Sequence, residues 1–90
     1  MTAAELAERL AGTDIPALLA SLGFQPEFVA KNVMSMNGEV TVAQVAMLWM
    51  GMPNKHDRKR TRQLLEALAD AGLLDRRGEE AYEVRPLQGA

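Results

Sequence analysis

Apolar residues recur three or four positions apart over most of the chain, which is the spacing of one face of a helix. Two such stretches stand in the N-terminal part, with Leu6 and Leu10 in the first and Leu18, Leu19 and Leu22 in the second. Thr2 and Glu5 have the spacing of a capping box, which predicts that a helix begins here. Asp14 is a suitable cap for the second helix, and Gly12 and Gly23 are suitable helix ends.

The same spacing predicts three more helices between residues 26 and 71. They begin near Pro26, after a Thr41 cap, and between Asn54 and Asp57, and they end at Asn37-Gly38, Met50 and about Ala71. Their inward residues are Val29, Val33 and Met36 in the first, Val42, Val45 and Trp49 in the second, and Thr61, Leu64, Leu65 and Leu68 in the third. Asp57 is the expected N-cap of the third helix, and Trp49 is expected to be largely buried beside Leu65 and Leu68.

Extended segments complete the pattern. Residues 39–41 form a short extended stretch, and residues 73–76 and 81–85 are two strands joined by a turn at 77–80. Tyr82 and Val84 lie on one side of the second strand because side chains alternate along a strand. Residues 27–85 therefore have the order helix, short strand, helix, turn, helix and β-hairpin.

This order resembles the winged helix-turn-helix superfamily of bacterial and phage transcription regulators. The resemblance is carried by the helix at 41–46, the run 61–68, and the exit Leu65, Leu68, Gly72, Leu73 and Leu74 before the charged hairpin. It implies a mainly α fold, in which a three-helix core and a C-terminal β-hairpin wing occupy residues 26–86. Residues 1–25 would form an N-terminal helical extension, and residues 87–90 a tail. In such proteins the second helix of the pair enters the DNA major groove, and the wing meets phosphates or the minor groove.

The charges are unevenly distributed, although the chain carries 10 Lys and Arg against 12 Asp and Glu. The segment 55–62 reads Lys-His-Asp-Arg-Lys-Arg-Thr-Arg, which places five basic residues against one acidic residue. A nearly neutral total can therefore hide one basic edge, the feature to which a phosphate backbone responds.

The candidate DNA-binding residues follow from the helical positions opposite the buried Leu65. Lys55, His56, Lys59, Arg62 and Gln63 face outward, where basic side chains suit guanine edges and phosphates and glutamine suits adenine. Arg58 and Arg60 lie on the flanks and are expected to reach phosphates. Arg76 and Arg77 are the candidates on the wing, although acidic neighbours offset them. The alternative is a solvated helix start, in which Arg62 pairs with Glu66 one turn later.

Three methionines are predicted to point away from the inward helix faces: Met34, Met47 and Met50. Exposed methionines adapt to partner surfaces. They favour either a homodimer, formed through the N-terminal helices together with these residues, or burial under the chain's own N-terminal helices.

Several function classes find no support in the sequence. The absence of cysteine excludes disulfides, cysteine-ligated metals and thiol nucleophiles, and a single histidine excludes a His-rich metal site. No phosphate-binding glycine loop and no catalytic constellation is present, so we expect no enzyme, no metal and no cofactor. No apolar run approaches the roughly 18 residues of a membrane span, and no signal peptide is recognisable, so the expected location is the cytoplasm.

The sequence-based expectation is therefore sequence-directed binding of double-stranded DNA by a small bacterial or phage transcriptional regulator. The alternative is a winged-helix adaptor that binds another protein and no DNA, for example a phage protein that binds a host complex. The excess of acidic residues over basic residues in residues 1–54 favours this alternative. Fold by itself does not decide between the two functions.

Overall fold

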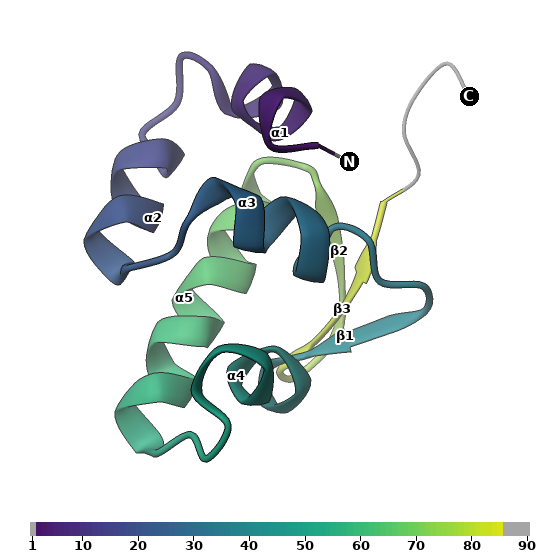
Figure 1. Ribbon diagram of the computed structural model, residues 1–90. Helices are drawn as coiled ribbons and strands as arrows, with labels where there is room; N and C mark the ends of the chain where they lie inside the picture. The colour runs from purple at the N-terminus through teal and green to yellow at the C-terminus, as the bar shows by residue number, and fades with distance from the viewer. Residues whose placement is uncertain (1, 86–90) are drawn as a thin grey trace.

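A computed structural model describes residues 2–85, which are mainly helical with a small antiparallel sheet (Figure 1). The elements in chain order are α1 (Ala3–Leu10), α2 (Ile15–Leu22), α3 (Pro26–Phe28), the π-helix η1 (Val29–Val33), β1 (Glu39–Thr41), α4 (Val42–Met50), α5 (Lys55–Asp70), β2 (Leu74–Gly78) and β3 (Ala81–Val84). The order of elements predicted from the sequence is confirmed. The tail expected at residues 87–90 lies outside the described residues.

Side-chain caps set the starts of α1 and α4. Thr2 and Glu5 form the predicted capping box, in which Thr2 Oγ1 accepts from the Glu5 backbone N–H at 3.1 Å. Thr41 forms a second box with Gln44. Asp14 occupies the cap position of α2 but makes no capping hydrogen bond with its side chain, so that part of the prediction is wrong.

The third helix departs from the predicted α-helical spacing. After Phe28 the backbone widens into η1, where the Met34 N–H donates to the Val29 carbonyl five residues earlier. A π-turn holds one residue more than an α-turn, so the residues that follow it are rotated on the helix surface. Met34 is consequently buried, at 6% exposed, and the prediction that it points outward is wrong.

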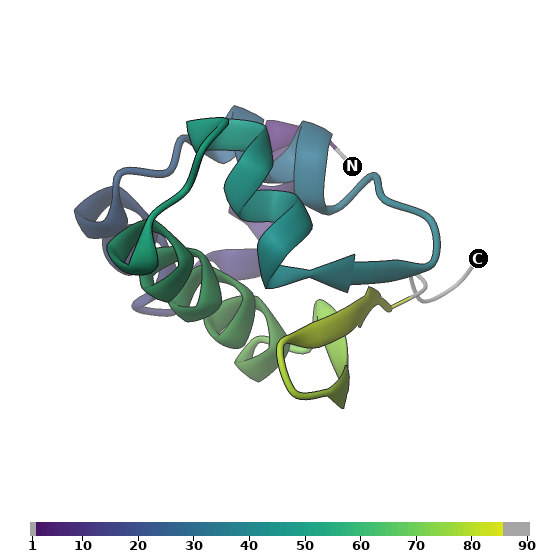
Figure 2. The ribbon, with the colours of Figure 1, turned by 90° about the horizontal axis from the view of Figure 1, so that it is seen from below.

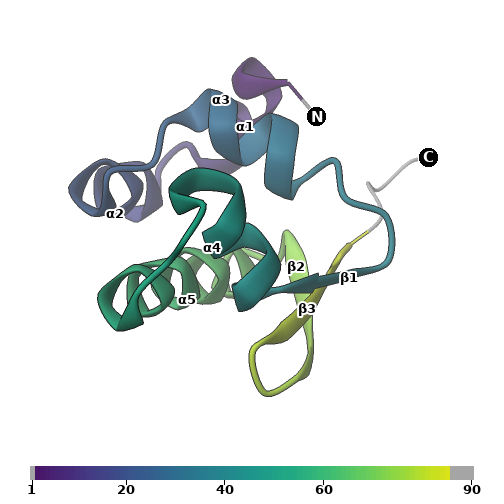
Figure 3. The same ribbon diagram turned by 60° about the horizontal axis from the view of Figure 1, so that its bottom comes forward.

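The three strands form one sheet in the order β1-β3-β2, with β3 antiparallel to both neighbours. Val40 pairs with Tyr82 across β1 and β3. β2 extends two residues beyond its predicted end and carries an irregularity between Arg76 and Gly78. The hairpin turn is therefore short, consisting of residues 79 and 80, and it projects beyond the helices (Figures 2 and 3).

One hydrophobic core joins the N-terminal helices to the rest of the chain. Leu6 and Leu10 of α1 and Leu19 and Leu22 of α2 belong to the same buried cluster as the leucines of α5. α2 also packs directly against α5, on the left of Figure 1. The segment predicted as an extension therefore supplies part of the common core.

Trp49 closes the edge of this core and is not at its centre. The indole is partly buried and packs against the cluster that contains Leu65 and Leu68, so its predicted burial is confirmed in part. Its Nε1–H donates to Thr61 Oγ1 at 2.9 Å, and the ring of Phe24 meets it edge-on with centroids 5.0 Å apart. The guanidinium of Arg60 covers the indole, with Cζ 5.0 Å from the ring centroid. Trp49 thus ties the end of α2 to α4 and α5.

The shared core predicts that damage to α1 will destabilise the whole chain. Leu10 is 2% exposed, so Leu10→Ala should lower the free energy of unfolding by about 2–5 kcal/mol. Leu48→Ala is the matched control, since Leu48 is 52% exposed and its loss should cost about 0.5 kcal/mol or less. Urea unfolding, followed by circular dichroism and by Trp49 fluorescence, would measure both. If circular dichroism showed loss of helix at a lower urea concentration than the change in Trp49 fluorescence, the chain would not have a single core.

Candidate nucleic-acid interface

The first turn of α5 is held by a capping box that uses the only acidic residue of the segment 55–62. Asn54 Oδ1 accepts from the Asp57 backbone N–H at 2.9 Å, and Asp57 Oδ2 accepts from the Asn54 N–H at 3.0 Å. Asn54 is therefore the N-cap, and the prediction that Asp57 takes this role is wrong. Asp57 is 6% exposed, so its carboxylate serves the helix end and little of it faces solvent.

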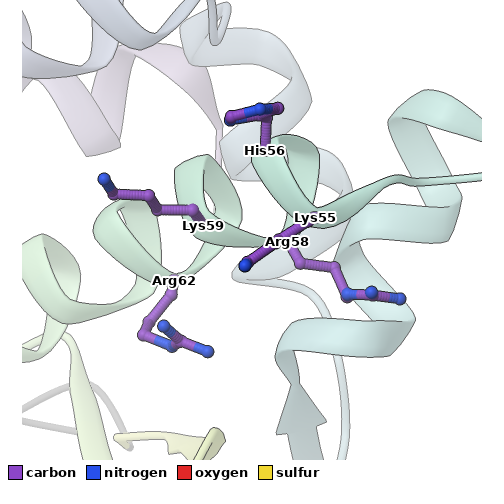
Figure 4. Close-up of a pocket in the computed structure, with 5 residues that line it drawn as sticks. All are labelled: Lys55, His56, Arg58, Lys59 and Arg62. Atoms are coloured by element: carbon purple, nitrogen blue, oxygen red, sulfur yellow. The ribbon is translucent and has the colours of Figure 1, made fainter.

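Five basic side chains from the first two turns of α5 line one open recess of about 420 Å³. We call it the basic recess, and its residues are Lys55, His56, Arg58, Lys59 and Arg62 (Figure 4). All five are exposed. Thr61, Leu64 and Leu65 on the opposite face of the helix are fully buried. Because that face packs in the core, the recess faces solvent.

The acidic residues farther along α5 are paired with the hairpin. Arg76 Nη2 lies 2.9 Å from Glu66 Oε1 and 2.6 Å from Asp70 Oδ1. Glu66 also accepts from the Tyr82 hydroxyl. The hydrogen bonds from Arg76 and Tyr82 lower the pKa of Glu66, while burial and the bond to Glu66 raise the pKa of Tyr82. These carboxylates therefore form no ion pair with the side chains of the recess, although the charge of Arg62 also lowers the pKa of Glu66.

Arg62 pairs with a different carboxylate from Glu66, the partner considered for it in a solvated helix start. It forms an ion pair with Glu80 in the hairpin turn, and not with Glu66. The hydrogen bond to Glu80 raises the pKa of the Arg62 guanidinium. Over residues 2–85, the other four side chains of the recess form no ion pair.

Four further candidates lie outside the recess. Arg60 turns to the opposite side, where Nη2 donates to the Leu22 carbonyl and the guanidinium covers Trp49. In this position it satisfies a carbonyl that the end of α2 leaves open, and its expected role at phosphates stays a prediction. Arg76 and Arg77 are engaged by carboxylates of α5 and the hairpin, with Arg77 Nη2 2.6 Å from Glu83 Oε1. Gln63 is exposed but does not line the recess.

Two residues that shape this site were missed by the sequence analysis. The pairing of Asn54 with Asp57 could have been found, because an N-cap residue followed three positions later by an acceptor is a local pattern. The pairing of Glu80 with Arg62 has no such signal. The two residues are 18 positions apart, and only the fold of the hairpin brings them together.

The capping box predicts a measurable effect on α5. Asn54→Ala removes the acceptor for the Asp57 N–H and should lower the free energy of unfolding by about 1 kcal/mol. Asn37→Ala is the control, since this exposed asparagine lies outside the helices. Both values come from urea unfolding of the purified variants. An equal effect of the two substitutions would show that the cap does not stabilise α5.

Comparison with known proteins identifies no family for this chain. No protein-family model, no curated protein and no solved structure matches the chain. Among residues 2–85, no three His, Asp or Glu side chains are grouped so that they could hold a metal ion. No helix within the same residues is long and apolar enough to cross a membrane.

Proposed function

We propose that this chain is a winged helix-turn-helix protein that binds double-stranded DNA, as a small bacterial or phage transcriptional regulator. In this proposal α4 and α5 are the helix pair, α5 is the helix presented to the major groove, and β2 and β3 form the wing. The order helix, strand, helix, helix and hairpin supports it, as does the three-stranded sheet that closes with β1. A B-DNA major groove, about 12 Å wide, admits one α-helix.

The observation that carries the proposal is the separation of charge along α5. The N-terminal half presents the basic recess, while the acidic residues of the helix are directed elsewhere. Asp57 is used in the cap, and Glu66 and Asp70 are bound by Arg76. Lys55, Arg58 and Lys59 form no ion pair among residues 2–85, and such a group of cations attracts a phosphate backbone, although the whole chain has a net charge of −2.

The proposal gives α5 and the wing different parts in DNA binding. Arg76 and Arg77 are held by carboxylates, so the wing has little positive charge to offer DNA. Affinity would therefore come chiefly from Lys55, Arg58 and Lys59, which suit phosphates and guanine edges. Gln63, which lies outside the recess, remains a predicted contact to adenine.

Substitution of two lysines tests this function. Lys55→Ala with Lys59→Ala should leave the free energy of unfolding within about 0.5 kcal/mol per site, because both side chains are exposed. Binding to duplex DNA should weaken, and the slope of log K against log salt should fall by about 0.9 for each phosphate that the variant no longer binds. Fluorescence anisotropy at several salt concentrations measures both quantities.

The matched control removes the same charge at a distance from the recess. Arg9→Ala with Lys31→Ala takes two exposed cations from α1 and η1 and should preserve the salt slope. A parent protein that binds no duplex DNA at low salt would overturn the proposal. Equal weakening in the two double variants would overturn the assignment to α5.

A second candidate function is supported by exposed apolar side chains at the end of α4. Met47 is 60% exposed, Leu48 52%, Met50 45% and Met52 93%. Patches of this kind mark protein-binding surfaces. They favour a winged-helix adaptor, or the predicted homodimer through the N-terminal helices with Met47 and Met50 but without the buried Met34. A parent protein that sediments as a monomer at high micromolar concentration would exclude the dimer.

A further inference from the structure

The contact between Arg62 and Glu80 sets one member of the basic recess apart from the others. Of the five side chains that line the recess, Arg62 alone has an acidic partner among the described residues. Figure 4 shows it pointing toward the hairpin, away from Lys59 and His56. A carboxylate placed beside a cation that binds only phosphate would weaken that binding, since carboxylate and phosphate repel each other. The pair therefore needs another explanation.

Glu80 lies at a junction of β2, β3 and α4. It is the second residue of the turn between β2 and β3, and its carbonyl accepts from the Val42 N–H at the start of α4. Its φ is +60°, a left-handed conformation that glycine adopts without strain and glutamate does not. A glutamate in a conformation that favours glycine directs attention to its side chain. That side chain is the one that binds Arg62.

We propose that Glu80 is a specificity-determining residue that positions Arg62 to bind a guanine edge and keeps it from binding phosphate. This inference rests on the proposed DNA-binding function. A free arginine side chain has many rotamers, and the ion pair restricts them before DNA arrives. The negative charge of Glu80 also disfavours phosphate at the same place.

The chemistry of the guanidinium allows both contacts at once. Arginine has five N–H donors in a planar fork. Glu80 takes a hydrogen bond from Nη2, which leaves donors on the remaining nitrogens. Guanine presents O6 and N7 as two acceptors in the major groove, and a bidentate arginine is the usual side chain that binds them. Glu80 therefore orients the fork without using all of its donors.

The residues of the basic recess then have two different roles. Lys55, Arg58 and Lys59 supply attraction to DNA of any sequence, because their charges have no acidic partner over residues 2–85. Arg62 supplies preference for one base. The wing turn would then contribute by orienting a side chain of α5, and its own contact with DNA would be minor.

The experiment compares two glutamates of the same turn. Glu80→Gln and Glu79→Gln each remove one negative charge, and among the described residues only Glu80 bonds to Arg62. Both variants should bind random duplex DNA somewhat more tightly and by a similar factor. A sequence selection with the parent should show guanine at one position, and Glu80→Gln should reduce that preference by roughly fivefold to a hundredfold. Glu79→Gln should leave the preference unchanged.

Two more variants separate positioning from folding. Glu80→Gly relieves the left-handed strain, so its thermal unfolding midpoint should not fall, yet it should lose the guanine preference. Arg62→Lys keeps the charge and should lose the preference with little change in binding to random DNA. Guanidinium NMR without DNA provides an independent readout, since Arg62 rotation should be slow in the parent and in Glu79→Gln but fast in Glu80→Gly.

The outcomes distinguish this inference from the function on which it rests. A parent that binds DNA with a preference that survives in Glu80→Gly would overturn the role of Glu80 and leave the proposed function intact. Equal guanidinium rotation in the parent and in Glu80→Gly would do the same without any DNA. A parent that binds no duplex DNA would overturn both.

Discussion

Burial of one face of α5 is the constraint on which the rest of the structure depends. Leu64, Leu65 and Leu68 are fully buried, and each contributes roughly 1.5–3 kcal/mol to folding. α2, α4 and β2 all pack against this helix, which is the longest in the chain. Because the leucines fix the rotation of α5 about its axis, the residues on its other side must face solvent. The basic recess lies on that side.

The distribution of charge on the surface depends on which group each carboxylate binds. Asp57 binds the helix start, Glu66 and Asp70 bind Arg76, and Glu83 binds Arg77. Ion pairs this exposed contribute little to stability. Their consequence is electrostatic, because Arg76 offsets one of the two negative charges of Glu66 and Asp70, and Arg77 offsets that of Glu83. A chain with a net charge of −2 can in this way present a positive surface.

The sequence determined the local structure of this protein in some detail. Caps such as Thr41, helical spacing such as that of Leu64 and Leu68, and the turn before Tyr82 all act within a few residues, so their effects could be predicted from neighbours alone. The order of elements and the inward face of α5 were correct for this reason. The π-turn at Val29 was not predicted, because an extra residue in one helical turn is favoured by packing against distant elements.

Only the tertiary structure decided which charged side chains are available to a ligand. The run 55–62 contains five basic residues, and nothing in it distinguishes Arg60 from Arg58. Arg60 turns inward because the open carbonyl of Leu22 and the face of Trp49 meet beside it. Arg62 is bound because the hairpin brings Glu80 across 18 residues. Sequence patterns describe preferences between near neighbours, whereas the partner of a long side chain is set by groups that become adjacent only when the chain folds.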